Sequence, residues 1–473
     1  MDQLPGKAPP IPKQFLFPAR LLLPRAGQPP LLEFEDIAPR LGIDRYDGNG
    51  TAAWADYDGD GDLDLFEAGS GEFIRVYRND GRRFTDATAQ AGLAGVPSGY
   101  SLNLVDYDSD GRPDLYISLN GWSGPMKNRL FHNTGGRFED VTDKSGAGDP
   151  GNGFVSLWAD FDNDGWLDLA IANGVLKDGS VPQIYRNNGD GTFTNMTRQA
   201  GIVEPPEYGA IGIALGDNNL DGRVDILING LDPALHRLYR NLGNWKFRDV
   251  AREAGLVQPL HNGFVCFLFD YDNDGRPDAL TTSLAAWESV VAALRIDSAV
   301  PKPRVHPDSS RLFGNNGDGT FSDLTDVVKF QRPGNKRKVV VFIDCEEDRD
   351  LDIYAQSGGH YPGDFSRNAF CRNLKANRTS WLQVDLKAAK CNRDASGARL
   401  TARSGGLLVF REVKGSEGFG ATSQRRRHFG FGQARLVDSL EVRWPSGVAQ
   451  TVGLLDADQV IEVEEGGGRR RVK

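Results

Sequence analysis

An aspartate-rich stretch at residues 56–64 has the composition of a metal-binding loop. It reads Asp-Tyr-Asp-Gly-Asp-Gly-Asp-Leu-Asp, so carboxylates stand at positions 1, 3, 5 and 9 and a glycine stands at position 6. Alternate carboxylates around a tight turn surround a hard cation with oxygen atoms, and a central glycine allows the chain to turn sharply. The chemistry that this pattern predicts is the binding of a divalent metal ion.

The same pattern recurs five more times along the chain. The acidic loops begin at Asp56, Asp106, Asp160, Asp217, Asp270 and Asp344, and we number them loops 1 to 6 in that order. Six copies with matching positions argue against the simpler interpretation that these are only solvated acidic turns. The candidate ligands are Asp56, Asp58, Asp60, Asp62 (through its backbone carbonyl) and Asp64; Asp106, Asp108, Asp110 and Asp114; Asp160, Asp162, Asp164 and Asp168; Asp217, Asn219, Asp221 and Asp225; Asp270, Asp272, Asp274 and Asp278; and Asp344, Glu346, Asp348 and Asp352.

Two of the loops depart from the pattern. Loop 4 has an amide, Asn219, at position 3, which keeps the oxygen and loses a charge. Loop 6 has Glu346 at position 3 and Arg349 at position 6, where a left-handed conformation costs a residue other than glycine about 1 kcal/mol. We therefore expect weaker binding at the sites that begin at Asp217 and Asp344.

The predicted cofactor is Ca²⁺, with up to six ions in a structural role. Oxygen ligands from one flexible loop suit Ca²⁺ better than Mg²⁺, which demands a stricter geometry. A catalytic or sensory role for the ions stays open as the alternative.

The spacing of the loops indicates how they are positioned. They return at intervals of 50, 54, 57, 53 and 74 residues, and a period near fifty is typical of a repeat architecture. Between the loops two phrases recur, Tyr-Arg-Asn-Asp-Gly as at residues 77–81 and Phe-Thr-Asp as at residues 84–86. A turn of this type between two apolar runs predicts a hairpin. With one strand before and one after the acidic loop, each unit has the four antiparallel strands of a propeller blade.

The predicted fold is all-β, a calcium-binding β-propeller with a small C-terminal β-domain. We count six repeat units, and seven blades stay open if the long last interval or the C-terminal region supplies another. The sixth unit lacks a fourth strand, which residues 32–38 would supply. The expected divisions are a Pro-rich arm (1–30), the propeller (31–378), the β-domain (379–465) and a basic tail (466–473) that we expect to be disordered. Strands of the β-domain are expected at residues 381–386, 398–402, 408–410, 440–444 and 459–463.

The composition agrees with an all-β fold and excludes few partners. The 57 glycines and 25 prolines among 473 residues indicate many turns. The formal charge of −10 would repel nucleic acid, but six divalent cations would more than neutralise it, so we infer no partner from charge.

The apolar run Phe15–Leu23 is too short to span a membrane. Pairing of Cys371 with Cys391 and two free thiols both stay open. Trp54 and Trp158, two residues before loops 1 and 3, are expected in the core.

The chain resembles a known combination of families. The acidic repeats resemble FG-GAP/VCBS repeats, the calcium-binding propeller repeats also found in integrin α chains. The phrases at residues 392–399, 415–419, 428–432 and 444–447 resemble the ASPIC/UnbV domain. Together they resemble the cartilage-acidic-protein-like (CRTAC-like) family over residues 31–465. The resemblance implies a calcium-stabilised, usually secreted propeller whose C-terminal domain has no agreed chemistry.

A ligand-binding face is expected at the end of the propeller opposite to the acidic loops. Successive connections in an antiparallel sheet alternate between its two ends, so the long second-to-third strand connections lie there. Long loops on a rigid scaffold are where binding residues concentrate. We therefore expect an interaction module for binding or adhesion to a protein or glycan. The candidate residues of this face are Trp122, Trp287, Glu288, His306, His360 and Tyr361.

An enzyme stays open as the alternative, a cyclase or hydrolase of secondary metabolism with its site at the channel mouth. No nucleophile elbow, phosphate loop or dinucleotide fingerprint is present, so we predict no catalytic residue and favour a non-enzymatic role. For His428 a packing role is preferred over anion binding. The expected partner is a protein, a glycan or a small molecule, not nucleic acid, and the oligomeric state stays open. The resemblance implies an extracellular or periplasmic location, but the start at Met1–Pro5 lacks a signal-peptide pattern, so the cytoplasm stays open.

Overall fold

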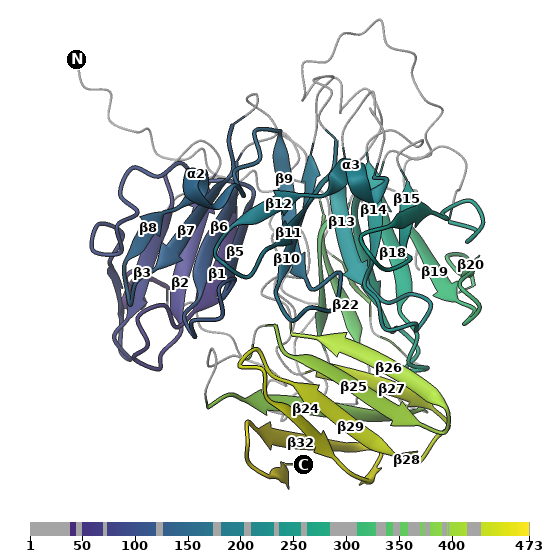
Figure 1. The fold of residues 1–473 in the computed structure, drawn as a ribbon. Coiled ribbons are helices and arrows are strands. Elements are labelled where there is room, and N and C mark those ends of the chain that lie inside the picture. The colour runs from purple at the N-terminus through teal and green to yellow at the C-terminus, as the bar shows by residue number, and fades with distance from the viewer. Residues whose placement is uncertain are drawn as a thin grey trace, which may run out of the picture. The chain divides into compact units, whose positions relative to one another are not determined.

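The computed structural model is built almost entirely of β-strands (Figure 1). It divides into two units, Met1–Arg45 and Tyr46–Lys473, and each is described by itself. The structure describes residues 38–43, 50–69, 73–119, 126–173, 181–202, 210–230, 236–256, 263–283, 310–327, 337–343, 351–357, 369–371, 373, 379–389, 395, 397–413 and 427–472. The predicted all-β class is confirmed, whereas the domain boundaries stay predictions.

The second unit begins with a series of antiparallel sheets in which each strand pairs with the next one along the chain. The described residues form five sheets of four strands, numbered 1 to 5, and a sixth of three strands. The predicted four-stranded repeat is thereby confirmed. Of the segment proposed to complete sheet 6, residues 32–37 lie outside the described residues. The strands are β1 (Gly50–Ala55), β2 (Asp64–Gly69), β3 (Arg75–Asn79), β4 (Phe84–Asp86), β5 (Ser101–Val105), β6 (Asp114–Ser118), β7 (Arg129–Asn133), β8 (Phe138–Asp140), β9 (Gly153–Ala159), β10 (Asp168–Asn173), β11 (Gln183–Asn187), β12 (Phe193–Asn195), β13 (Ala210–Gly216), β14 (Asp225–Gly230), β15 (Arg237–Asn241), β16 (Phe247–Asp249), β17 (Gly263–Phe269), β18 (Asp278–Ser283), β19 (Arg311–Asn315), β20 (Phe321–Asp323), β21 (Arg337–Ile343), β22 (Asp352–Ser357) and β23 (Ala369–Cys371).

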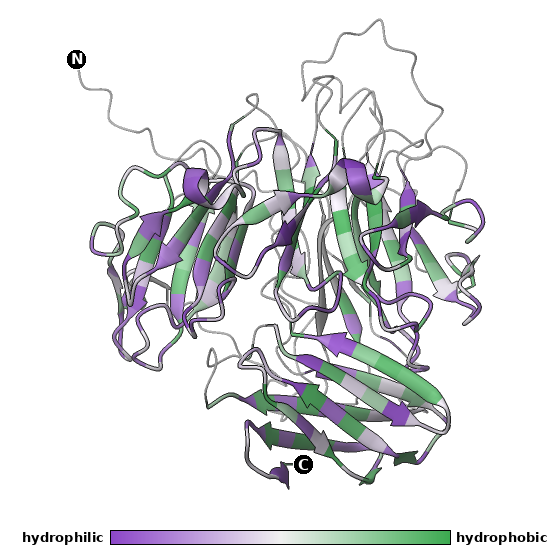
Figure 2. Ribbon diagram, viewed as in Figure 1, coloured by the Kyte–Doolittle hydropathy of each residue, from purple (hydrophilic) through white to green (hydrophobic). Residues whose placement is uncertain are grey.

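Successive sheets pack through their first strands, as the blades of a propeller do. β1 contacts β5, and the series continues through β9, β13 and β17 to β21. β5 and β9 are buried along their whole length. Their buried polar side chains satisfy one another, because Asn103 is hydrogen-bonded to both Ser101 and Ser156. A Cβ atom on Gly212 of β13 would lie 2.7 Å from the Phe264 carbonyl oxygen, so a glycine is needed where β13 and β17 meet. Figure 2 shows hydrophobic residues along the strands and hydrophilic residues in the connecting loops.

The two tryptophans that precede loops 1 and 3 differ in their surroundings. Trp158 is 2% exposed, as predicted, whereas Trp54 is 45% exposed, so its assignment to the core was wrong. Alternation along β1 places Ala53 and Ala55 in the core shared with sheet 2. Trp54 therefore lies on the opposite face of the sheet, where it makes an edge contact with Phe84.

Short helical turns follow several fourth strands and were not expected. These are α2 (Thr142–Ser145) and α3 (Thr197–Ala200), and α1 (Ala38–Leu41) lies in the first unit. Gly146 and Gly201 end α2 and α3 in the left-handed conformation, at φ 74° and 82°. These two glycines therefore act as helix C-caps.

The C-terminal residues form two further four-stranded sheets and one pair of strands. The sheet orders are β27-β24-β32-β33 and β26-β25-β29-β30, with β28 beside β31. Their side chains share one core, separate from those of the repeated sheets. The expected strands are present, but the disordered tail was a wrong prediction, because β33 pairs with β32. The strands are β24 (Ser380–Lys387), β25 (Arg399–Ser404), β26 (Leu407–Glu412), β27 (Arg427–Gly432), β28 (Leu436–Val437), β29 (Ser439–Arg443), β30 (Ala449–Val452), β31 (Leu455–Asp456), β32 (Gln459–Glu464) and β33 (Arg469–Arg471).

Two remaining expectations concern cysteines and membrane spans. Cys266 and Cys371 are free thiols, and Cys391, the suggested partner of Cys371, lies outside the described residues. Within the part of the chain that the structure describes, no helix has the length and apolar character needed to cross a membrane.

Candidate metal centres

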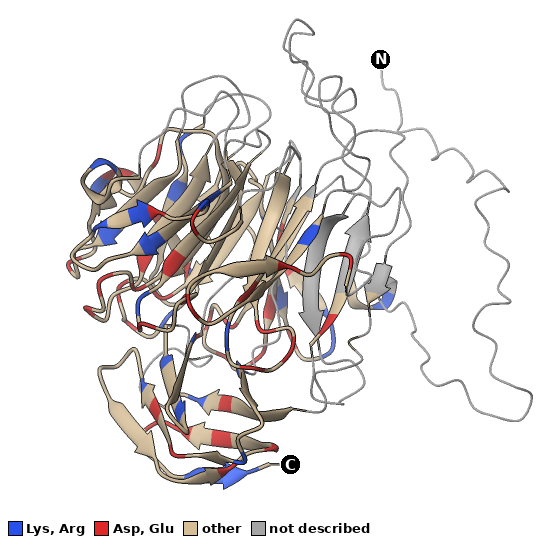
Figure 3. Cartoon of the chain, turned by 90° about the vertical axis from the view of Figure 1, so that its right-hand side faces the viewer, with Lys and Arg blue, Asp and Glu red and all other residues tan. Residues whose placement is uncertain are grey.

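Each acidic loop joins the first strand of a sheet to the second, and in four of the loops the folded chain brings carboxylates together. In loops 1, 2, 3 and 5 one oxygen from each of positions 1, 3 and 9 lies within 4.8 Å of the others. In Figure 3, where acidic residues are coloured red, several of the loops at the strand ends are red. The four groups are Asp56, Asp58 and Asp64; Asp106, Asp108 and Asp114; Asp160, Asp162 and Asp168; and Asp270, Asp272 and Asp278.

In loops 1 to 5 the carboxylate at position 9 is buried. Asp64, Asp114 and Asp168 are fully buried at the start of the second strand. In loop 1, Asp64 Oδ1 accepts the backbone N–H of Asn79 at 2.8 Å, and its Oδ2 accepts that of Tyr57 at 3.2 Å. Loops 2 to 5 repeat both bonds, with distances of 2.7–2.8 Å at Oδ1 and 2.8–3.4 Å at Oδ2. Position 9 is therefore held by the third strand of its own sheet and by position 2 of its own loop.

Burial shifts the acidity of these groups strongly. Desolvation raises the pKa of Asp64 and of Asp114 to about 7, and that of Asp225 to about 8. Burial likewise raises the pKa of Asp270, at position 1 of loop 5, to about 7. A bound divalent cation would offset this cost, because it stabilises the ionised form of every carboxylate around it.

Positions 1 and 5 close the turn. The Oδ2 atom of the position-1 aspartate accepts the N–H of the position-6 glycine at 2.7–3.0 Å in loops 1 to 5. The Oδ1 atom of the position-5 aspartate accepts the N–H of position 7 at 2.9–3.0 Å in the same loops. The position-6 glycines have positive φ, so the glycine has the predicted role. The predicted position-5 ligands are not part of the four groups above.

An asparagine of the Tyr-Arg-Asn phrase connects each loop to the preceding one. Asn187 donates its side-chain N–H to the Leu167 carbonyl oxygen of its own loop at 3.1 Å and to the Tyr107 carbonyl oxygen of loop 2 at 2.8 Å. The other connections run from Asn133 to Tyr57, from Asn241 to Phe161, from Asn315 to Asn218 and from Asn373 to Tyr271. Sequence reasoning took these asparagines for turn residues only. Their recurrence at one position of every unit was the available signal.

The residue before this asparagine in the Tyr-Arg-Asn phrase is basic in sheets 2 and 3, and its side chain faces the acidic loop of the same sheet. Arg186 lies 3.1 Å from Asp162 and 3.2 Å from Asp164, at positions 3 and 5 of loop 3. In sheet 2 a histidine takes this place. His132 Nδ1 lies 3.1 Å from both Asp108 Oδ2 and Asp114 Oδ1, and its Nε2 lies 3.8 Å from Asp110.

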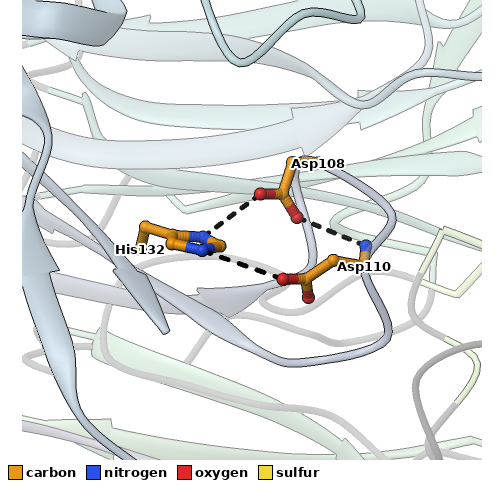
Figure 4. Close-up of side chains that lie close together, drawn as sticks. All are labelled: Asp108, Asp110 and His132. Carbon is orange, nitrogen blue, oxygen red and sulfur yellow. Dashed lines mark hydrogen bonds and ion pairs between the residues drawn. The ribbon is translucent and has the colours of Figure 1, made fainter. Parts of the chain in front are cut away.

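Figure 4 shows the His132 ring facing the carboxylates of Asp108 and Asp110, with one ring nitrogen toward each. The hydrogen bond to Asp114 raises the pKa of His132, so the ring carries positive charge more readily. The geometry agrees with a structural role for His132 in place of the arginine, although this ring and the two carboxylates are also close enough to hold a cation.

The oxygen atoms of the acidic loops form a ligand set that fits a hard divalent cation. Asp272 Oδ1 and Asn219 Oδ1, the position-3 oxygens of loops 5 and 4, are buried and accept no hydrogen bond from the described residues. A buried acceptor without a donor is costly unless something else binds it. Both oxygens belong to the predicted ligand sets, so a metal ion would satisfy them.

Several predicted site residues cannot be placed. Asp344, Glu346 and Asp348 of loop 6 lie outside the described residues, and only Asp352 is seen, buried at the start of β22. The whole candidate ligand face also lies outside them, namely Trp122, Trp287, Glu288, His306, His360 and Tyr361. In contrast, His428 is buried between Asn273 and Gln383, which agrees with the expected packing role.

Comparison with protein families matches both halves of the chain. The model of the FG-GAP-like repeat matches residues 56–117, 119–171 and 160–228. The model named ASPIC and UnbV matches residues 388–470.

Among curated proteins, cartilage acidic protein 1 of Homo sapiens is 27% identical over 293 residues, which cover 59% of this chain and 40% of that protein. The Xenopus tropicalis protein of that name is 28% identical over 272 residues, covering 56% of this chain and 38% of the relative. The chain thus spans about two fifths of the length of the curated relatives it matches.

Similar solved structures share little sequence with the chain. The V. cholerae biofilm matrix protein Bap1 has a TM-score of 0.36 and 14% identity, over 90% of this chain and 61% of that one. Aleuria aurantia lectin has a TM-score of 0.34 and 11% identity, over 69% and 96%. These are distant likenesses of fold.

The family matches fall on the two structural regions described above, the repeated sheets with their acidic loops and the C-terminal sheets. The chain therefore consists of an FG-GAP-like repeat propeller followed by an ASPIC and UnbV domain, and it is homologous to cartilage acidic protein 1.

Proposed function

We propose that the chain is a calcium-stabilised interaction module that binds a protein or glycan through the propeller face opposite to the acidic loops. The observation that supports metal binding is the pair of buried position-3 oxygens in loops 4 and 5, which accept no hydrogen bond from the residues that the structure describes. They lie in loops that offer oxygen ligands and, apart from His132 in loop 2, no nitrogen or sulfur ligand. Such a set favours Ca²⁺ over the transition metals.

The contacts of the loops support a structural role for the ion. In loop 3 the position-9 carboxylate is bonded to the third strand of its own sheet and to position 2 of the loop, and the carbonyl at position 2 accepts an asparagine N–H from the following sheet. An ion held at positions 1, 3 and 9 would therefore reinforce a junction between sheets. Because this role is sufficient to explain the loops, a ligand is expected elsewhere on the molecule.

The opposite face is the favoured location for the ligand. In each four-stranded sheet the acidic loop joins the first strand to the second, so the connection from the second strand to the third starts at the other end. The candidate residues, with Trp122 first among them, belong to these connections and stay predictions. An extracellular or periplasmic location belongs to the same proposal. It is supported by homology to cartilage acidic protein 1.

A binding screen with and without calcium tests this function. The full chain is labelled and applied to arrays of glycans and of extracellular matrix proteins, in Ca²⁺ and after metal removal. We expect binding in Ca²⁺, its loss without metal, and its loss in Trp122→Ala. Trp54→Ala is the matched control, because Trp54 is an exposed tryptophan on a strand rather than in a face loop. Binding that survives metal removal and Trp122→Ala would contradict the proposal, as would the absence of any ligand from both arrays.

A further inference from the structure

Loops 3 and 5 share a contact with the C-terminal sheets. Arg399, at the start of β25, lies 3.0 Å from Asp160 Oδ2, and Arg411 of β26 lies 3.4 Å from Asp270 Oδ2. Both carboxylates stand at position 1 of their loops and are 2% exposed, and the arginine side chains are themselves mostly buried. Burial removes hydration from both charges, so pairs of this kind form only where good geometry and further hydrogen bonds offset that cost.

The arginine binds the same oxygen in both loops. Asp160 Oδ2 also accepts the N–H of Gly165 at 2.9 Å, and its Oδ1 accepts that of Asp164 at 3.1 Å. Loop 5 repeats these bonds, with Gly275 bonded to Asp270 Oδ2 and Asp274 bonded to Oδ1. Oδ2 is therefore occupied by two donors, which leaves Oδ1 as the oxygen with capacity for a cation.

An asparagine at position 4 is a second shared contact. Arg399 bonds Asn163 Oδ1 in loop 3, and His428 Nε2 lies 2.6 Å from Asn273 Oδ1 in loop 5. The N–H of Gly432 donates to the Asn273 carbonyl oxygen at 2.8 Å. Loops 1, 2 and 4 have Gly, Ser and Leu at this position. Asparagine at position 4 thus occurs in the two loops that β25, β26 and β27 contact.

The close contact between the C-terminal sheets and loop 5 depends on the turn conformation of that loop. A Cβ atom on Gly430 would lie 2.3 Å from the carbonyl carbon of Asn273, and one on Gly275 would lie 2.9 Å from the Gly430 oxygen. Asn273 and Gly275 have positive φ, at 58° and 91°. Contact this close requires the loop to keep the turn in which positions 1, 3 and 9 converge.

Other contacts hold the two guanidinium groups in place. Arg411 donates from Nε to the His428 carbonyl oxygen at 3.0 Å and from one terminal nitrogen to the Phe410 carbonyl oxygen at 2.9 Å. The Arg399 guanidinium lies 4.9 Å from the centre of the Phe410 ring, and that of Arg411 lies 5.7 Å from the Phe429 ring. Both groups are therefore oriented before any ion binds.

We infer that Arg399 and Arg411 are positioning residues for the metal sites of loops 3 and 5, so that the C-terminal domain completes these two sites and raises their affinity for calcium. The inference rests on the proposed calcium binding. A partner bonded to the outer oxygen of a ligating carboxylate fixes its orientation, as outer-shell groups do in other metal sites. The positive charge is tolerated because loop 3 has four carboxylates, twice the charge of the ion. Since coupling between two binding events is reciprocal, an ion in loop 5 also strengthens the contact with the C-terminal sheets.

Calcium titration of the full chain tests the two arginines. Arg399→Met and Arg411→Met keep the length of the apolar stem and remove the guanidinium. Each is expected to weaken one site by about 10- to 100-fold while the other sites keep their affinity, the range seen when outer-shell partners of metal ligands are removed. Arg399→Lys, which keeps the charge and loses the second nitrogen, should recover part of the loss. Arg403→Met is the matched control, because Arg403 is an exposed arginine of the same strand.

Hydrogen exchange tests the reciprocal effect with both arginines in place. The readout is the Gly432 amide, which donates to Asn273 of loop 5. Its protection should fall in Asp272→Ala, which removes a ligand of loop 5, and should be unchanged in Asp58→Ala, which removes the equivalent ligand of loop 1.

The outcomes separate this inference from the proposed function. A wild-type chain that binds no calcium overturns both. Calcium binding with the same affinities in Arg399→Met, Arg411→Met and Arg403→Met overturns the positioning role alone. Equal Gly432 protection in Asp272→Ala and Asp58→Ala also overturns it, and this comparison decides the matter if an arginine variant does not fold.

Discussion

The side-chain N–H of Asn133 donates to the backbone carbonyl oxygen of Tyr57 at 2.8 Å, across 76 residues of sequence. Tyr57 stands at position 2 of loop 1, and Asn133 ends β7 in the following sheet. Four further asparagines make the same connection, so one side chain per sheet joins an acidic loop to its neighbour. The loops are therefore part of the packing between sheets, and this determines how their loss should affect stability.

Asn187→Ala is expected to destabilise the fold by about 3 kcal/mol, because it removes several buried hydrogen bonds and leaves carbonyl groups without a donor. Urea unfolding followed by tryptophan fluorescence measures this. Asn188→Ala, one residue later at an exposed position, should cost less than about 1 kcal/mol. Similar losses in the two variants would show that the connection between sheets contributes little.

Removal of calcium is expected to lower the melting temperature by about 10 °C or more, because each occupied site adds about 3 kcal/mol when the ion is at a hundred times its dissociation constant. Differential scanning calorimetry in Ca²⁺, in Mg²⁺ and after chelation measures the effect. Mg²⁺ should restore only part of the shift. Equal melting temperatures in all three conditions would refute a stabilising role for calcium.

The metal-free chain is expected to lose stability as the pH rises from about 4 to about 8. Burial raises the pKa of Asp64 and of Asp114 to about 7 and that of Asp225 to about 8, so the folded state binds more protons than the unfolded state over this range. Stability is therefore present at low pH and lost as these groups ionise. In Ca²⁺ the trend should reverse, since the ion binds the ionised carboxylates.

Melting curves between pH 5 and pH 8, recorded on a chain stripped of metal by a chelating resin, check this dependence. The control is the same series in excess Ca²⁺. A metal-free chain whose stability rises with pH would contradict the expected ionisation.

Asn219→Asp is expected to tighten calcium binding at loop 4 by about tenfold, because it adds a carboxylate at position 3 and affinity rises with ligand charge. The Asn219 Oδ1 atom is buried and has no hydrogen-bond donor within the described part of the chain, so the added charge would face the ion rather than solvent. Calorimetric titration should show one site gaining affinity. An exposed change of the same chemistry, Asn188→Asp, should leave every site unchanged.

Local pattern was enough to predict the repeated sheets and to mark the acidic loops, and positions 1, 3 and 9 converge in loops 1, 2, 3 and 5. A carboxylate at alternate positions with a central glycine specifies the turn by itself, and the apolar runs on either side specify the strands. The same reasoning failed for Trp54, because alternation alone does not show which face of β1 is covered. It also failed for the basic tail, because pairing of β33 with β32 depends on backbone groups rather than on apolar side chains.

The sequence by itself determined the number and type of the acidic loops, since each loop is a short contiguous stretch whose conformation depends on its own residues. Only the tertiary structure decided which groups surround those loops. The bonds from Asn133 to loop 1, from Arg399 to loop 3 and from Arg411 to loop 5 join residues that lie 76, 239 and 141 positions apart. No local pattern encodes such distances, because they depend on how whole sheets pack against one another.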